Sequence, residues 1–218
     1  MTERLPRPDT ARVRDTIPGP EELTVLPAGT VLVRVHPLGG AHPAAWNELR
    51  AFGPTKSRFD HQTLPRRNHP TRRIAYLTMG PDAFVAALAE WFQDDGGGVG
   101  PFDLTLRQPA ITILETATEL TLLDLDSGWV TRVGGNQAIR SGPRGVCRDW
   151  SRAICRHHQN LQGLAFGSSV WGPGRCLALW ERAAMAFPAA PTATRQLDDP
   201  ALTLAVMDAA QRLGSYVL

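Results

Sequence analysis

The sequence has few cysteines and no long apolar run. Its three cysteines, Cys147, Cys155 and Cys176, form no CxxC pair, and their number is odd. A disulfide framework or a structural zinc site is therefore not expected, and the thiols should stay reduced, as in a cytoplasmic protein. No apolar stretch approaches the ~20 residues of a membrane-spanning helix. The first residues are too polar for a signal peptide, so we expect a cytoplasmic protein without membrane contact.

A strong excess of one charge is also missing. Lysine and arginine total 23 and aspartate and glutamate 21, which gives a net charge of +2. The positive residues are spread along the chain, so direct binding of nucleic acid, as by a nucleic-acid-acting toxin, is disfavoured. The adjacent His157 and His158 would point about 100° apart on a helix. We therefore interpret them as surface residues, and no metal is expected.

The familiar catalytic motifs are absent as well. The sequence contains no Walker A loop, no GxGxxG, no HExxH and no GxSxG. The common interpretations as a nucleotide-binding protein, a metalloprotease or a hydrolase therefore lack support.

What the sequence does contain is a series of short apolar and β-branched runs. They predict strands at residues 30–35, 74–79, 111–114, 119–125, 163–170 and 176–180. Helices are expected at 82–90, at 149–161 and from 200 to 213, with a short helix at 46–52. Strands with a few helices and no internal repeat predict an α+β fold in a single domain. The polar, proline-rich residues 1–27 are expected to form an extended N-terminal arm. Residues 28–188 would form the domain, and residues 189–218 a C-terminal extension with a helix.

Three charged residues stand out against their apolar surroundings. Arg34 interrupts a β-branched run, Arg58 follows a turn-rich segment, and Glu90 ends an otherwise apolar helix. Arginine binds phosphate with two parallel hydrogen bonds and keeps its charge. A lone carboxylate near such a clamp suggests chemistry on a phosphorylated substrate that forms a cation. Each residue alone is more simply explained as a solvated surface charge, so the inference depends on their joint occurrence.

The order of these residues carries a family resemblance. The chain presents, in sequence, Arg34, Ser57-Arg58-Phe59-Asp60, Tyr76-Leu77, Glu90, Leu123-Asp124-Leu125 and Gly163-Leu164-Ala165-Phe166-Gly167-Ser168. This pattern, over about residues 28–182, resembles the RES domain, a family named for an Arg, a Glu and a Ser. The resemblance assigns these three catalytic residues to Arg34, Glu90 and Ser168. It also implies a fold similar to the diphtheria-toxin-type ADP-ribosyltransferases, with a strongly bent, mostly antiparallel sheet and flanking helices.

The same resemblance implies an NAD-consuming toxin that cleaves the nicotinamide–ribose bond. That cleavage passes through an oxocarbenium-like state, which Glu90 would stabilise electrostatically. Arg34 and Arg58 would hold the pyrophosphate or an incoming phosphate. Ser168 would orient the nicotinamide ribose or amide, Tyr76 would stack on nicotinamide, and Phe166 would also line the substrate site.

NAD would be the substrate, so no separate cofactor is expected. The acceptor stays open among inorganic phosphate, water and a protein side chain. As a partner the resemblance implies a small, helical, DNA-binding antitoxin of the Xre-like kind, whose tail would cover the pocket. The alternative is a non-catalytic binding protein that uses the same fold.

Overall fold

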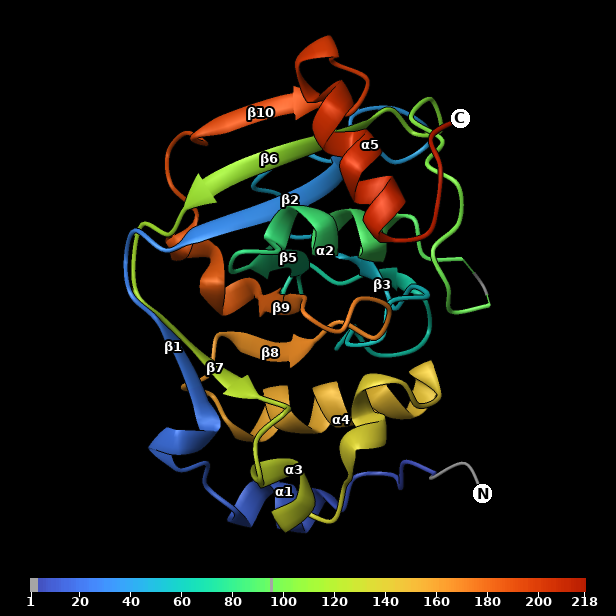
Figure 1. The fold of residues 1–218 in the computed structure, drawn as a ribbon. Coiled ribbons are helices and arrows are strands. Elements are labelled where there is room, and N and C mark those ends of the chain that lie inside the picture. The colour runs from blue at the N-terminus through green and yellow to red at the C-terminus, as the bar shows by residue number, and fades with distance from the viewer. Residues whose placement is uncertain (1–3, 95) are drawn as a thin grey trace.

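A computed structural model describes residues 4–94 and 96–218. Its main feature is a sheet of eight strands in the order β1-β7-β8-β9-β5-β2-β6-β10 (Figure 1). Neighbouring strands run antiparallel except β7 and β8, which are parallel. In Figure 1, β10, β6 and β2 cross the upper part of the molecule, whereas β1 and β7 descend steeply along its left side. The described chain is thus an α+β fold around a bent, mostly antiparallel sheet, as predicted.

The elements of the fold have the following bounds. The strands of the main sheet are β1 (Leu23–Leu26), β2 (Val31–Pro37), β5 (Ile74–Met79), β6 (Pro109–Glu115), β7 (Leu120–Asp124), β8 (Gly163–Gly167), β9 (Arg175–Trp180) and β10 (Ala193–Gln196). A separate two-stranded ladder joins β3 (Phe52–Gly53) and β4 (Arg67–Asn68). The α-helices are α1 (Thr10–Asp15), α2 (Ala83–Trp91), α3 (Trp129–Arg132), α4 (Arg144–His157) and α5 (Thr203–Arg212). Short 3-10 turns cover Pro20–Glu22, Gln137–Arg140, Glu181–Ala186 and Pro200–Leu202.

The predicted strands and long helices are found close to their expected places. The six predicted strands correspond to β2, β5, β6, β7, β8 and β9, and the long helices to α2, α4 and α5. The short helix predicted at 46–52 is wrong. Arg50 instead exchanges backbone hydrogen bonds with Ile74 of β5, at 2.8 and 3.1 Å, and Phe52 begins β3. Helix propensity is a weak preference, and here pairing with a strand edge overrides it.

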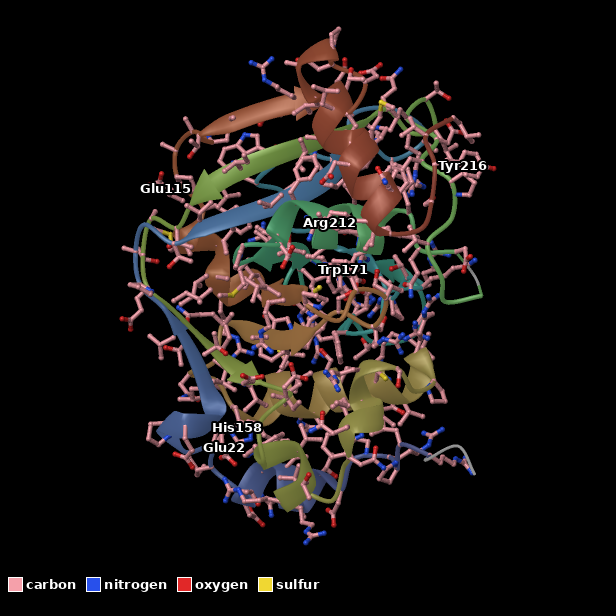
Figure 2. All side chains as sticks on the ribbon, in the orientation of Figure 1. Glu22, Glu115, His158, Trp171, Arg212 and Tyr216 are labelled. Carbon is pink, nitrogen blue, oxygen red and sulfur yellow. The ribbon has the colours of Figure 1, made fainter. Side chains whose placement is uncertain are left out.

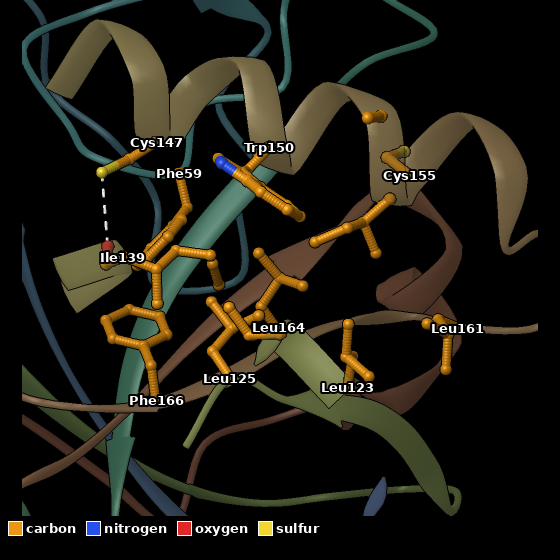
Figure 3. Close-up of a cluster of buried hydrophobic side chains, with 14 of the residues drawn as sticks. Phe59, Leu123, Leu125, Ile139, Cys147, Trp150, Cys155, Leu161, Leu164 and Phe166 are labelled. Carbon is orange, nitrogen blue, oxygen red and sulfur yellow. Dashed lines mark hydrogen bonds between the residues drawn. The ribbon is translucent and has the colours of Figure 1, made fainter. Parts of the chain in front are cut away.

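Alternation along the strands divides the apolar side chains between two faces of the sheet. Leu164 and Phe166 of β8 face one core, and Ala165 between them faces another. Figure 3 shows the first core, where Trp150 and Cys155 of α4 lie over the side chains of β7 and β8. A third core packs α2 and α5 against β2 and β6. This packing fixes α2, the helix that carries Glu90, beside the sheet.

The N-terminal segment is part of the fold rather than an extended arm. Within residues 4–27 it forms α1 and β1, and β1 pairs along its whole length with β7. The indole nitrogens of Trp129 and Trp150 donate hydrogen bonds to the carbonyls of Thr16, at 2.9 Å, and Pro6, at 2.8 Å. Leu5 of this segment is buried in the first core. At the other end, β10 adds to the sheet beside β6, so both terminal segments supply a strand.

His158 is buried, which corrects its interpretation as a surface residue. Its Nε2 donates to the carbonyl of Val13 at 2.7 Å, and its ring meets that of Trp129 edge-on. Figure 2 labels His158 in the lower part of the molecule. Burial lowers the pKa of His158, while the Val13 carbonyl opposes that shift. The sequence pattern missed this because α1, a distant segment, covers the end of α4. In the described chain, no helix has the length and apolarity to cross a membrane.

Candidate functional site

A cleft opens where strands β2 and β5 part. The two strands pair only at Leu32 with Met79 and at Val33 with Thr78. Beyond Val33, β2 continues along β6 and β5 continues along β9, so the facing edges of β2 and β5 separate. The cleft between them has a volume of about 1000 Å³ and is lined by Val33–Pro37 and Ile74–Thr78. That volume suits a ligand as large as a dinucleotide.

The walls of the cleft are strongly basic. Among the described residues, eight arginine and lysine side chains and three carboxylates line it, although the whole chain carries a net charge of only +2. The cations are Arg34, Arg50, Lys56, Arg58, Arg66, Arg107, Arg140 and Arg144, and the carboxylates are Glu48, Glu90 and Asp94. Positive charge that is dispersed in the sequence is thus gathered by the fold. Such a field attracts anions into the cleft.

Arg34 is a buried cation of this wall. Its side chain donates a hydrogen bond of 2.6 Å to the carbonyl of Trp46. Burial lowers the pKa of Arg34 to about 10, helped by the neighbouring charge of Arg50 and opposed by Glu48. The group therefore keeps its charge at neutral pH. Among the residues that the structure describes, no carboxylate forms an ion pair with Arg34, so its remaining donors suit an anionic ligand.

Glu90, a carboxylate of the cleft, is held by Ser168. The Ser168 hydroxyl donates to Glu90 Oε1 at 2.6 Å and accepts from the backbone N–H groups of Val170 and Trp171, at 3.2 and 3.0 Å. Glu90 lines the cleft, and so does Ser169. Ser168 does not line the cleft but contacts Glu90. The hydroxyl thus orients the carboxylate. Burial, followed by the nearby Glu90, raises the pKa of the Cys176 thiol well above its ordinary value.

Asp60 is a central residue that sequence reasoning did not assign to the site. Its side chain is fully buried, and its two oxygens accept four hydrogen bonds. Arg50 and the Tyr76 hydroxyl donate to Oδ1, at 2.6 and 2.9 Å, and the backbone N–H and hydroxyl of Thr55 donate to Oδ2, at 2.6 and 2.8 Å. Burial and then the charge of Asp60 raise the pKa of Tyr76 well above its ordinary value. The phenol therefore stays protonated as a donor.

Arg58 and Phe166 line the cleft next to the core of Figure 3. Arg58 donates to the carbonyl of Gly142 at 2.5 Å, which ties it to the loop before α4. Phe166 is buried, and its ring centroid lies 4.5 Å from that of Phe59. Phe166 therefore contributes mainly packing. In Figure 3 it points up from β8 toward the end of the core that holds Ile139 and Phe59.

The six residues predicted for the site come together at this cleft. Five of them line it, namely Arg34, Arg58, Tyr76, Glu90 and Phe166, and Ser168 contacts Glu90 directly. Sequence reasoning missed Arg50, Asp60, Arg140 and Arg144. Of these, only Asp60 could have been found from the sequence, because it ends the run Ser57-Arg58-Phe59-Asp60 of the family pattern. The others are single arginines in segments without periodicity.

A group of possible metal ligands lies outside the cleft. One ligand atom each from His61, Cys155 and Glu181 lies within 4.8 Å of the others. These atoms already have partners: His61 Nε2 lies 3.0 Å from Glu181, and the Arg182 guanidinium lies 2.8 Å from the Cys155 sulfur. A fixed cation beside the thiol opposes a second cation, so we assign no metal to this group.

Fold and site together define an α+β protein with a basic cleft large enough for a dinucleotide. No family profile matches the chain, and no curated protein sequence matches it either. Among solved structures, the chain is similar to one in the crystal structure of the M. tuberculosis MbcT–MbcA toxin–antitoxin complex. The TM-score is 0.55 at 16% sequence identity, covering 90% of this chain and 94% of that one. At this identity the likeness shows a shared fold, in agreement with the α+β fold predicted from the sequence.

Proposed function

We propose that this chain is the toxin of a toxin–antitoxin pair and that it consumes NAD by cleaving the nicotinamide–ribose bond. One observation carries the proposal. Glu90, fixed by Ser168, lies in the same basic cleft as the buried cation Arg34. A dinucleotide offers phosphates for the cations and a sugar for the carboxylate. The shared fold with a chain of a toxin–antitoxin complex supports the toxin role.

The residues of the cleft have different roles in the proposed reaction. Arg34, Arg50 and Arg58 bind the pyrophosphate through charge-assisted hydrogen bonds. When the bond between ribose carbon and nicotinamide nitrogen breaks, its electron pair leaves with nicotinamide and positive charge develops on the sugar. Glu90 stabilises that charge, an electrostatic effect on the order of 10²–10³ in rate. The Tyr76 hydroxyl is held by Asp60, and its ring would stack on nicotinamide.

An acceptor then bonds to the ribose carbon. Inorganic phosphate, water and a protein side chain are each chemically able to do so. Phosphate is the favoured acceptor, because it needs no activating base and the cationic wall attracts it. The basic cleft also suits a partner: a helical, DNA-binding antitoxin with an acidic segment would be drawn to the same wall and exclude NAD.

The test is direct measurement of nicotinamide release from NAD by the purified protein, with and without phosphate. Glu90→Gln should lower the rate by about 10²–10³ while the far-ultraviolet circular dichroism stays unchanged. Glu115→Gln, at the exposed end of β6, is the matched control and should keep full activity. Folded wild-type protein that releases no nicotinamide under either condition would overturn the proposal and favour a non-catalytic binding protein.

A further inference from the structure

The mouth of the cleft presents one aromatic ring to solvent on a rigid support. Phe52 lines the cleft with 43% of its surface exposed. Single exposed apolar side chains are ordinary. Among the large apolar side chains of the described residues that are exposed, however, only Phe52 lines the cleft. Its backbone is held on two sides: Arg50 donates to its carbonyl, and Phe52 pairs with Asn68 across the ladder of β3 and β4.

Groups suited to a planar base surround this ring. The Arg66 guanidinium lies over the face of the Phe52 ring, with its central carbon 5.1 Å from the ring centroid. The His42 ring lies nearly parallel to the Phe52 ring, with centroids 6.4 Å apart. Directly paired residues of a ladder point to the same face, so Asn68 lies beside Phe52. Asn68 is exposed and lines the cleft, so its amide is accessible to a ligand. An asparagine amide can pair with both N6 and N7 of adenine.

The position of this ring along the cleft matches one end of a dinucleotide. Arg50 contacts Phe52 and Asp60, and Asp60 contacts Tyr76 of β5. Two residues further along β5, Thr78 pairs with Cys176, the thiol that lies beside Glu90. The wall therefore runs from Phe52 through a guanidinium and a phenol to the carboxylate. The two ends are an aromatic face and an acid, with cations between them.

We infer that Phe52, Asn68, Arg66 and His42 form an adenine subsite. The base stacks on this group of aromatic and guanidinium planes, and the Asn68 amide binds the edge of the base. Stacking of a base on an aromatic side chain and recognition by an amide are established modes of base binding. This inference rests on the proposed function for its substrate, NAD, and its test separates the two.

The experiment compares NAD with nicotinamide mononucleotide, which lacks the adenine half. The quantity measured is the ratio of kcat/KM for NAD to that for the mononucleotide. Phe52→Ala should lower this ratio by about 5- to 150-fold, the range typical of base–aromatic stacking. Phe52→Trp should preserve it. Leu204→Ala, which removes an apolar side chain 83% exposed on α5, is the control and should leave the ratio unchanged. An unchanged ratio in Phe52→Ala overturns the subsite and leaves the proposed reaction standing.

Two further measurements complete the test. Asn68→Ala should reduce the preference for NAD over its hypoxanthine analogue, because the analogue has already lost the N6 amino group; an unaltered preference counts against the amide contact. If wild-type protein turns over neither substrate, the binding of AMP measured by calorimetry tests the subsite instead. Weaker AMP binding in Phe52→Ala supports the subsite without the proposed reaction. Wild-type protein that binds no AMP overturns it.

Discussion

Replacing Asp60 by asparagine tests whether one buried carboxylate organises the cleft. The change keeps the shape of the side chain and removes its charge. Both carboxylate oxygens accept two hydrogen bonds each, from Arg50 and Tyr76 on one side and from Thr55 on the other. An amide offers one oxygen and one NH₂ group. In either orientation, two donors must therefore face another donor.

The size of the effect follows from the burial of the two partners. Breaking a buried ion pair costs about 3–5 kcal/mol of unfolding free energy. The Arg50 side chain is 29% exposed, so water compensates it in part, whereas Asp60 is fully buried. We therefore take the lower end, roughly 3 kcal/mol. For a chain of this length, that corresponds to a fall in Tm of about 6–12 °C.

Urea unfolding followed by tryptophan fluorescence measures this loss. Asp149→Asn is the matched control, because Asp149 also pairs with two arginines but is 26% exposed, whereas Asp60 is fully buried. The Asp149→Asn protein should lose only about 0–1 kcal/mol of unfolding free energy. Asp60→Asn should also raise KM for NAD, since Arg50 and Tyr76 lose the group that orients them. An Asp60→Asn protein as stable as Asp149→Asn, with wild-type KM, would refute the role of Asp60 as organiser.

Three more outcomes are expected. Arg34→Lys should weaken NAD binding by about 10-fold in calorimetry, because a point charge cannot replace a two-pronged donor; an unaltered Kd contradicts this. Ser168→Ala should lower kcat by about 2- to 10-fold with little change in KM, since the hydroxyl orients Glu90; a rise in KM alone would argue against it. Burial lowers the pKa of both His36 and His158. The unfolded chain therefore binds more protons as pH falls below about 6.5, and stability should decrease from there by up to ~1.4 kcal/mol per pH unit per histidine. His158→Gln should show a shallower slope between pH 7 and 5.5, and an equal slope would exclude this histidine as a source.

The parts of the site that sequence could predict are those set by local pattern. β2 and β5 are short apolar runs, so a charged Arg34 within one of them was visible. Glu90 stood out in the same way on α2. These two share a cleft because β2 and β5 part after Val33, which depends on pairing with β6 and β9. No local pattern encodes that divergence, and only the family resemblance anticipated it.

The segment from residue 38 to 73 shows why the rest was missed. It has no hydrophobic periodicity, because its shape is set by individual polar contacts with distant residues. Asp60 binds Tyr76 sixteen positions away, and Arg58 binds Gly142 eighty-four positions away. The helix expected at 46–52 failed for the same reason, since Arg50 pairs with Ile74. The burial of His158 likewise depends on Val13, 145 positions away.

The positive charge of the cleft disfavours the proposed reaction unless bound phosphates neutralise it. A positive charge that develops on the sugar is disfavoured near cations, and the eight arginine and lysine side chains would raise its energy if they surrounded it. In the proposed reaction, phosphates bound at the guanidinium groups would neutralise them, and Glu90 could then stabilise the charge on the sugar. The same cations that bind the substrate therefore need the substrate's own phosphates before Glu90 can act, so a nicotinamide riboside without phosphate should be a poor substrate.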